Sequence, residues 1–420
     1  MGMRLPAVKE LVSRKTDSRD GIMSFAGDEV RIIHSADFHL GARAGLGAKT
    51  AEHHGLLFEA LERVSKLAAQ AADVLLVVGD LLDQAPVSEH VAGALAARTT
   101  EAILGALQAA PSLHVVIIRG NHDREVAYDK GAWRELGSHE RVRIVSEPQL
   151  VALDEVGINI VALPWMGGEP VQWRDWPAAE PTVVAAHCCY PQALTGPQDF
   201  VLTQQEVESW PVKYVALGHY HSGPTYRVGD RHVVYAGAPE VVNVSQEGKG
   251  RVVRVRVGRD GSASWEPVPI GSLTGLGSQE WRLEELPEPH LASLRQRLEA
   301  LAGEKHWLRV RVTGRRSSFG PLDLDSVQQG LADKFFSLEL IDETNPPIDV
   351  EALQAGEGEI VLKHFLRIAQ EELAAARANA ERAKASGRQE EEDKARKSIE
   401  ILREALERGY SVLRTSEERT

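Results

Sequence analysis

Short apolar runs that end in polar residues recur along the first half of the chain. One run, at residues 115–118, is rich in β-branched side chains and leads into the sequence Arg-Gly-Asn-His-Asp at 119–123. This run predicts a buried strand, and side chains that can bind metal or move protons follow at its carboxyl end. Four further runs follow the same plan and lead into segments that begin at Asp37, Gly79, His187 and Gly218. Functional side chains at the carboxyl ends of the strands are typical of an open α/β sheet.

Two stretches with apolar residues at helical spacing lie between the first three of these predicted strands. They occur at residues 56–67 and again at 87–109. Strand, helix and strand in this rhythm predict right-handed βαβ units with parallel pairing. Beyond residue 141 the helical spacing thins out, and short strand-like runs follow at 142–145, 149–153, 158–163, 233–235 and 251–257. The whole pattern predicts an α/β fold in which two sheets pack face to face between helices, an α-β-β-α order of four layers.

The chain divides into four predicted parts. Residues 1–28 show no sustained period and are predicted to form a tail. The main α/β domain spans 29–272, and a glycine-rich stretch at 271–277 predicts a linker after it. Residues 273–346 predict a second, small α/β domain. Residues 347–420 are rich in Ala, Glu, Lys, Arg and Leu, which predicts two long helices with a turn at Ser386-Gly387.

The small domain is predicted from an alternation of strand and helix patterns. Strands are expected at 280–283, 307–312 and 337–341, and helices at 289–302 and 322–334. Asn345-Pro346-Pro347 then breaks the chain before the C-terminal helices.

Composition and charge narrow the class of protein. The chain has 420 residues, of which 43% are hydrophobic and 26% charged, as in ordinary globular proteins. No apolar run reaches the length that spans a bilayer, and the N-terminus lacks the apolar core of a signal peptide, so we expect no membrane association. The two cysteines, Cys188 and Cys189, are adjacent, which excludes a disulfide framework and suits the reducing cytoplasm. The net charge of −13 argues against a chain that coats nucleic acid, although bound cations would reverse the sign within a local cleft.

The polar residues at the strand ends form one chemical set of carboxylates, one amide and imidazoles. The set is Asp37, His39, Asp80, Asn121, His187, His219 and His221. It favours Mn²⁺, Fe²⁺ or Zn²⁺ over Ca²⁺ or Mg²⁺, which prefer all-oxygen cages. The set is too large for one tetrahedral site, but with one carboxylate shared it fills two sites. Two adjacent cations can ionise a water and hold a phosphate, so the pattern predicts hydrolysis of a phosphate ester. A lone histidine at a strand end is more often packed or solvated, but that explanation does not cover the whole set.

These residues stand in motifs that resemble those of the calcineurin-like metallophosphoesterase superfamily. The motifs are Asp-x-His at 37–39, Gly-Asp-x-x-Asp at 79–83, Gly-Asn-His-Asp at 120–123, the histidine at 187, and Gly-His-x-His at 218–221. The resemblance covers roughly residues 31–257. It implies that one metal is held by Asp37, His39 and His221, and the other by Asn121, His187 and His219. It also implies that Asp80 bridges the two metals.

The same resemblance implies roles for residues beside the metals. His122 is then the catalytic histidine rather than a ligand, and it stabilises the pentacoordinate phosphorus or protonates the leaving oxygen. Asp123 is expected to orient the imidazole of His122, as carboxylates commonly do. Asp83 is expected to support the ligands from outside, at a place where some relatives carry a histidine.

The superfamily serves protein phosphatases, cyclic-nucleotide phosphodiesterases, nucleotidases and DNA nucleases, so the fold alone does not decide the substrate. Three looser resemblances favour SbcD-type exonuclease subunits. The small α/β domain is similar in order and size to their DNA-capping domain. Residues 235–239 and 248–250 are similar to the segment that closes their catalytic domain, and the long C-terminal helices lie where that family grips a coiled-coil ATPase. Arg315 and Arg316, which cluster with Arg309 and Arg311, fit DNA-backbone binding and a solvated edge equally well.

The resemblance leads us to expect a DNA nuclease subunit that uses two divalent ions, Mn²⁺ above all, and that works with an SMC-like ATPase in double-strand-break repair. The expected substrates are DNA ends, duplex and single-stranded, cut by exonuclease action with endonuclease action left open. The C-terminal helices have two apolar faces, one at residues 361–373 and one at residues 399–410. We expect a cytoplasmic homodimer whose residues 355–415 dock on the coiled coil of the ATPase, although a hairpin that packs its two apolar faces together is an equally good explanation. The alternatives are a small-molecule or cyclic-nucleotide phosphodiesterase and a mainly DNA-end-bridging scaffold.

Overall fold

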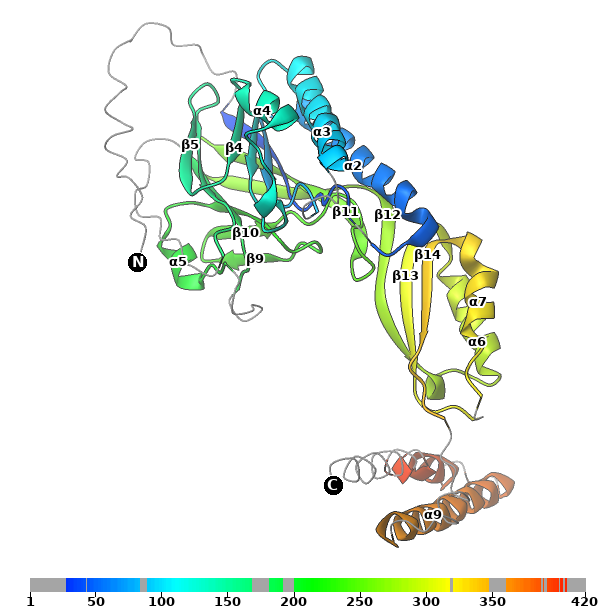
Figure 1. Ribbon diagram of the computed structural model, residues 1–420. Coiled ribbons are helices and arrows are strands. Elements are labelled where there is room, and N and C mark those ends of the chain that lie inside the picture. The colour runs from blue at the N-terminus through cyan, green and yellow to red at the C-terminus, as the bar shows by residue number, and fades with distance from the viewer. Residues whose placement is uncertain are drawn as a thin grey trace, which may run out of the picture. The chain divides into compact units, whose positions relative to one another are not determined.

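Figure 1 shows a computed structural model of the protein. It describes residues 28–42, 44–83, 89–167, 181–191, 200–317, 320–346, 360–386, 388, 391–399, 401–402 and 405. These residues fall into two compact units. The first contains the residues up to 314 together with 322–344, and the second contains 315–321 and the residues after 344. The predicted tail lies outside the described residues except for Asp28.

The first unit is built on two sheets. The larger has, in order across the sheet, β14 (Phe335–Asp342), β13 (Gly303–Thr313), β12 (Ala263–Arg282), β11 (Glu247–Gly258), β1 (Glu29–Ser35), β2 (Val74–Val78), β3 (His114–Ile118) and β4 (Val142–Val145). The smaller has β5 (Gln149–Leu153), β6 (Ile158–Leu163), β7 (Thr182–His187), β8 (Tyr214–Gly218), β10 (Arg231–Tyr235) and β9 (Thr225–Val228). Two sheets of this kind agree with the predicted α/β class.

Successive strand residues point to opposite faces of the larger sheet and so create two cores. Ile33 and Leu75 pack against the covering helices, whereas the alternate residues Ile32 and Leu76 pack against the smaller sheet. The covering helices are α2 (Thr50–Ala71), α3 (Glu89–Ala109) and α4 (Gly131–Ser138). The outer face of the smaller sheet is covered by α5 (Gln204–Ser209) and neighbouring loop residues. The predicted four-layer α-β-β-α order is therefore confirmed, and Figure 1 shows α2 and α3 running along the larger sheet.

The strands that carry the predicted donors pair in parallel. β1, β2, β3 and β4 form one parallel set, and β6, β7, β8 and β10 form another. This pairing confirms the βαβ units expected from the sequence. It places the carboxyl ends of β1, β2 and β3 at one edge of the larger sheet and those of β7 and β8 at one edge of the smaller sheet.

The glycine-rich stretch at 271–277 is part of a strand, so its prediction as a linker is wrong. It lies inside β12, which is 20 residues long and pairs with β11 on one side and with β13 from Thr274 onward. Its glycines permit close approach instead of flexibility. A Cβ atom at Gly275 would lie 2.1 Å from the carbonyl oxygen of Gln246. The larger sheet therefore continues unbroken across the predicted domain boundary.

The predicted small α/β domain is the far end of the larger sheet. There β12, β13 and β14 pair in parallel, and α6 (His290–Ala300) and α7 (Leu324–Leu331) pack on one face through a core that includes Trp281, Leu298 and Val310. The helix expected at 322–334 is divided into α7 and the short 3-10 helix η5 (Ala332–Lys334). We refer to residues 273–314 and 322–342 as the cap.

The second unit contains α9 (Ile360–Ala385) and a further helical segment at 391–399. Ser386 N donates to the carbonyl of Arg382 where α9 ends, at the turn expected from the sequence. Residues 374–397 are almost wholly Ala and charged, yet Ala376 and Ala383 are buried, because small side chains allow close packing. Leu406 and Tyr410, which the sequence places on an apolar face, lie outside the described residues. Among the helices of the described segments, none combines the length and the apolar character that a bilayer crossing demands.

Candidate metal centre

Four of the predicted metal ligands have a backbone conformation that L-residues rarely adopt. The φ angles are 56° at Asp37, 48° at His39, 52° at Asp80 and 106° at His219, and these are the non-glycine residues with positive φ in the described part of the chain. Such conformations cost on the order of 1–3 kcal/mol each and persist only where the surrounding structure enforces them. Strain concentrated on these residues is the first structural sign of a functional site.

Glycines in the motifs allow strands and ligands to approach closely. A Cβ atom at Gly79 would lie 2.0 Å from His187 Nδ1, and one at Gly120 would lie 2.1 Å from Asp80 Oδ1. A Cβ atom at Gly218 would lie 1.9 Å from the carbonyl oxygen of Val78. Any larger residue at these positions would push the donors apart, which explains why glycine directly precedes three of them.

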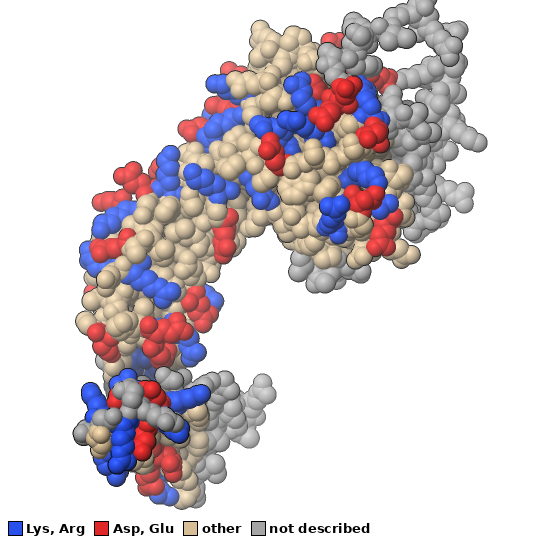
Figure 2. Space-filling model, turned by 180° about the vertical axis from the view of Figure 1, so that it is seen from behind, with Lys and Arg blue, Asp and Glu red and all other residues tan. Residues whose placement is uncertain are grey.

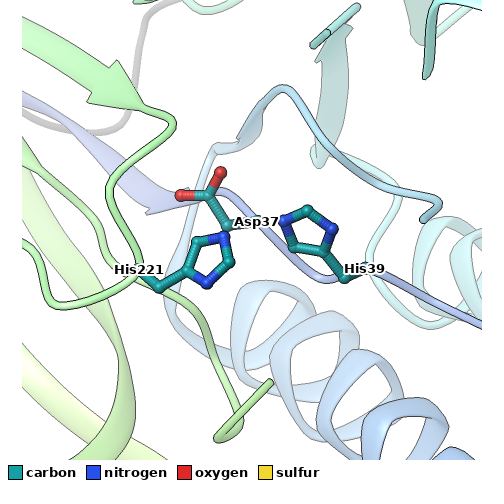
Figure 3. A group of neighbouring side chains, drawn as sticks. All are labelled: Asp37, His39 and His221. Atoms are coloured by element: carbon teal, nitrogen blue, oxygen red, sulfur yellow. The ribbon is translucent and has the colours of Figure 1, made fainter. Parts of the chain in front are cut away.

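Asp37, His39 and His221 form a first group of donors. Their ligand atoms lie within 4.8 Å of one another, and Figure 3 shows the three side chains together, two from the segment after β1 and His221 from the segment after β8. His39 Nδ1 lies 3.2 Å from Asp83 Oδ1, which can only accept, so this nitrogen carries the proton. His39 Nε2 is then a bare acceptor. It is buried, has no hydrogen-bond partner among the described residues, and lies 3.6 Å from Asp80 Oδ2.

Asp80, His187 and His219 form a second group, again within 4.8 Å. His187 Nδ1 donates to the carbonyl of Val78 at 2.9 Å, so its Nε2 is the nitrogen available to a metal. This nitrogen faces two acceptor oxygens, Asp80 Oδ2 at 3.3 Å and Asn121 Oδ1 at 2.9 Å. His219 Nδ1 lies 3.2 Å from the same Asn121 oxygen. All seven predicted donors therefore lie in or beside these two groups.

Comparison with known proteins gives a family for the larger part of the first unit. The sequence model of the calcineurin-like phosphoesterase family matches residues 30–223. Residues 30–223 form a calcineurin-like phosphoesterase domain. The chain is also similar to the SbcD subunit of the nuclease SbcCD from Rhodobacter capsulatus, with 30% identity over 150 residues, which cover 33% of this chain and 35% of that protein. The match thus spans about a third of the length of this curated relative.

Solved structures give more distant matches. A dimetal phosphatase from Danio rerio has 10% identity and a TM-score of 0.34, and covers 57% of this chain and 99% of its own. Nuclease MPE from Pseudomonas putida has 17% identity and a TM-score of 0.22, and covers 52% of this chain and 81% of its own.

The donor set of the phosphoesterase domain fits the divalent metals that the fold implies. The Nε2 atoms of His39 and His187 both face Asp80 Oδ2, so positive charge, a proton or a cation, is needed between these lone pairs. Each imidazole is held in the metal-binding tautomer by an acceptor on its other nitrogen, which is the usual support for a histidine ligand. One cation could be held by Asp37, His39, His221 and Asp80, and a second by Asp80, Asn121, His187 and His219.

The ionisable groups of the phosphoesterase domain show how the site behaves without cations. Burial raises the pKa of Asp37 to about 7. Burial also disfavours charge on Asp80 and on His187, but their mutual attraction outweighs it, lowering the pKa of the Asp80 carboxyl and raising the pKa of His187 to about 9. Burial and the neighbouring His39 lower the pKa of His221 to about 3. The raised pKa of His187 favours a proton on the side of the ring that faces Asp80, so metal uptake is expected to release protons.

His122 lies next to the metal-binding residues and is paired with Asp83. Asp83 Oδ1 is 2.9 Å from His122 Nδ1, and the side chains are 24% and 27% exposed. The interaction with Asp83 raises the pKa of His122 above its ordinary value, although partial burial opposes the shift. The rings of His122 and His39 are 4.6 Å apart, so the Asp83 carboxylate contacts both a ligand and the predicted catalytic histidine.

The expectation that Asp123 orients His122 needs correction. The Asp123 carboxylate is fully buried and accepts hydrogen bonds from three backbone amides, those of Leu81, Leu82 and Gly120, at 2.9–3.2 Å. It thereby ties the segment after β2 to the segment after β3. The orienting carboxylate is Asp83, which reaches the imidazole from the neighbouring strand end.

A cavity of about 380 Å³ adjoins the metal centre of the phosphoesterase domain. It is lined by His219, Tyr220, His221, Ser222, Pro224, Asn243, Ser245 and Gln246. Sequence reasoning missed Asn243, whose Nδ2 lies 3.2 Å from His221 Nδ1. It also missed Trp165, whose ring centroid lies 5.5 Å from that of His219. Neither residue stands in a motif, so the sequence held no signal for them.

The two arginines predicted to bind DNA lie in the second unit and make backbone contacts. Arg315 Nη1 donates to the carbonyl of Pro346 at 2.6 Å, and Arg316 Nη1 donates to the carbonyl of Gly320 at 2.8 Å. Both side chains are partly buried. The Arg315 contact joins the segments before and after α7, and the Arg316 contact lies within the segment before α7, so both guanidinium groups have a structural use.

The other arginines of the predicted basic cluster are paired with glutamates. Arg309 Nε lies 2.6 Å from Glu339 Oε2, and Arg311 lies 3.1 Å from Glu280 and 3.2 Å from Glu343. In Figure 2 basic and acidic side chains are intermixed on the visible surface. The arginines of the cap that pair in this way are largely neutralised by their glutamates.

Proposed function

We propose that this chain is a DNA nuclease subunit that hydrolyses phosphodiester bonds with two divalent cations, Mn²⁺ in particular, during double-strand-break repair. One observation carries the hydrolytic part of the proposal. The two donor groups share Asp80, whose Oδ2 faces both His39 and His187, beside a histidine that is poised by a carboxylate. The similarity to a nuclease subunit supports DNA as the substrate.

The chain's own residues divide the chemical work. Bound divalent cations would supply the positive charge that holds a phosphate and makes a water more acidic. His122 Nδ1 faces Asp83, so Nε2 is the atom that can hold a proton for the leaving oxygen, and the raised pKa favours that protonated form. The cavity beside His219 and His221 leaves room for the nucleoside next to the scissile phosphate.

The proposed partners are DNA ends, an SMC-like coiled-coil ATPase and a second copy of this chain, in the cytoplasm. Exposed apolar residues support a protein partner for the second unit, since Ile368 is 47% and Ile401 58% exposed. Arg315 and Arg316 are the proposed contacts to the DNA backbone.

The deciding experiment is a digest of end-labelled linear and circular DNA with Mn²⁺, with Mg²⁺ and without metal. We expect nucleotide release from linear DNA only with metal, and no release by the Asp80→Asn protein. Hydrolysis of small diesters without DNA binding would instead indicate a small-molecule phosphodiesterase. End bridging that survives in the Asp80→Asn protein, without DNA hydrolysis by the wild type, would indicate a scaffold.

The partner is tested by truncation after Asp349. We expect the truncated chain to lose co-purification with the ATPase and to keep Mn²⁺-dependent hydrolysis of a small phosphodiester. A truncated chain that still forms the complex would assign the C-terminal helices to self-association or to the chain's own fold.

A further inference from the structure

The loop at residues 240–246, which joins β10 to β11, takes part in the metal centre. We call it the coupling loop. Asn243, Ser245 and Gln246 of this loop line the cavity beside His219 and His221. Asn243 Nδ2 lies 3.2 Å from the ring nitrogen Nδ1 of His221. The loop therefore supports one predicted metal ligand from the side that faces away from the first donor group.

The same loop also takes part in the seat of the cap. Val241 and Val244 form one apolar cluster with Leu273 of β12, Trp307 of β13 and Phe336 of β14. Lys49, directly before α2, and His53 in the first turn of α2 complete the seat. Lys49 Nζ donates to the carbonyls of Phe335 and Phe336 at 3.1 and 2.5 Å, and His53 Nε2 donates to the carbonyl of Val241 at 2.8 Å.

Glu240 anchors the start of the coupling loop to β12. Its side chain is buried, and its carboxylate accepts hydrogen bonds from Ser272 N at 2.6 Å, Leu273 N at 2.9 Å and Arg63 Nη2 at 3.1 Å. The register between β11 and β12 is interrupted here, between the pairs at Lys249 and Arg251. Two amides of β12 thus donate to Glu240 where a regular ladder would use β11.

Internal hydrogen bonds make the coupling loop a single body. Gln246 Oε1 accepts from Val242 N at 2.8 Å, and Gln246 Nε2 donates to the carbonyl of Glu240 at 3.3 Å. Asn243 Oδ1 accepts from Ser245 N at 3.0 Å. A displacement of the cap-facing valines must therefore move Asn243 as well, because close-packed interiors transmit strain.

We infer that the coupling loop transmits the seating of the cap to His221, so that the cap positions one half of the metal centre. The inference rests on the proposed metal-dependent function. Glu240 and Asn243 are positioning residues in it, since they act through His221 rather than on the substrate.

Two neighbouring phenylalanines of β14 offer a matched test. Phe336 lies in the cluster with the coupling loop, whereas Phe335 lies in the cap's own core with α6 and α7. Phe336→Leu and Phe335→Leu remove the same atoms from opposite faces of one strand. Amide hydrogen exchange of residues 240–246 is measured in the metal-free full chain, and Mn²⁺ binding is measured by calorimetry.

We expect Phe336→Leu to speed exchange in the coupling loop and to weaken one of the two Mn²⁺ sites, each by roughly tenfold, as partial loss of a buried ring implies. Phe335→Leu should lower the melting temperature by a similar amount. It should leave hydrogen exchange in the coupling loop and Mn²⁺ binding as in the wild type. Equal effects of the two variants, or no effect of Phe336→Leu, would overturn the inference.

Glu240→Gln gives a second route, because an amide nitrogen cannot accept from the donors around it. It should weaken the same single Mn²⁺ site, and Glu339→Gln, which alters an exposed pair in the cap, is its control. An unaltered Mn²⁺ isotherm in Glu240→Gln would also overturn the inference. A wild type that fails to bind two Mn²⁺ would instead refute the proposed function, while the exchange comparison would still decide whether the loop couples to the cap.

Discussion

The larger sheet contains two sets of parallel strands whose side chains differ sharply in their partners. β1 and β2 end at the donors Asp37, His39 and Asp80, where bare imidazole nitrogens face carboxylate oxygens and the backbone has positive φ. The cap strands have the same parallel pairing, but their charged side chains are satisfied, as in the pair of Arg309 with Glu339 at 2.6 Å. Parallel strands therefore bring polar residues together in both places. The metal centre differs from the cap in that hydrogen-bond acceptors are left facing one another there.

The largest expected effect comes from Asp80→Asn, because its Oδ2 faces both donor groups. The variant should bind neither cation and lose all hydrolysis while remaining folded, as judged by elemental analysis and circular dichroism. Asp73→Asn is the matched control, because Asp73 stands at the opposite end of β2 and pairs with Arg31. Two equivalents of Mn²⁺ retained by Asp80→Asn would refute the bridging assignment.

His122→Asn should keep metal and DNA binding but lower kcat strongly. A general acid typically contributes roughly 10²–10⁴-fold to turnover, so a loss of that size is expected in single-turnover kinetics. Loss of metal in this variant would make His122 a ligand and overturn the division of roles.

Asp83→Asn should shift the pH dependence of turnover. Asp83 raises the pKa of His122, so protonated His122 persists to higher pH in the wild type. Without that carboxylate, the fall in kcat with rising pH should begin at lower pH, which a pH profile of single-turnover rates would detect. Asp123→Asn is the comparison, because the Asp123 carboxylate accepts hydrogen bonds from backbone amides. Its replacement should lower stability rather than change the pH at which kcat begins to fall. If only Asp123→Asn changed the pH at which kcat begins to fall, Asp123 would be the residue that orients His122, as first expected.

The smallest effect is expected from the arginines in the second unit. Replacing Arg315 and Arg316 with Ala should weaken DNA binding similarly across sequences and flatten its dependence on salt, because phosphate contacts carry that dependence. Arg309→Ala is the control, since Arg309 is paired with Glu339 and its exposed pair is worth only about 1 kcal/mol or less. If DNA binding by the double variant depended on salt as in the wild type, the two arginines would have only their contacts to backbone carbonyls and no contact to DNA.

Local patterns determined the layers of this protein and the donor residues of its metal centre. Short continuous apolar runs indicated buried strands, and the polar residues after Ile118 and Val78 indicated where the functional residues begin. These inferences hold because strand periodicity and the direction of parallel strands are properties of short segments. The glycines of the motifs needed the structure for their explanation, since only there is it seen that Gly79 and Gly120 have no room for a side chain.

Tertiary structure alone decided which side chains meet across distant segments. Asp83 and Asp123 each stand within three residues of a predicted metal ligand. In the structure, Asp123 accepts hydrogen bonds from three backbone amides, whereas Asp83 pairs with His122. The stretch at 271–277 became a strand because β11 and β13 lie on either side of it, which its glycines could not reveal. Asn243 contacts His221 from a loop that Glu240 links to β12 by hydrogen bonds. Such contacts depend on register and on buried hydrogen bonds between segments far apart in the chain, and no local pattern encodes them.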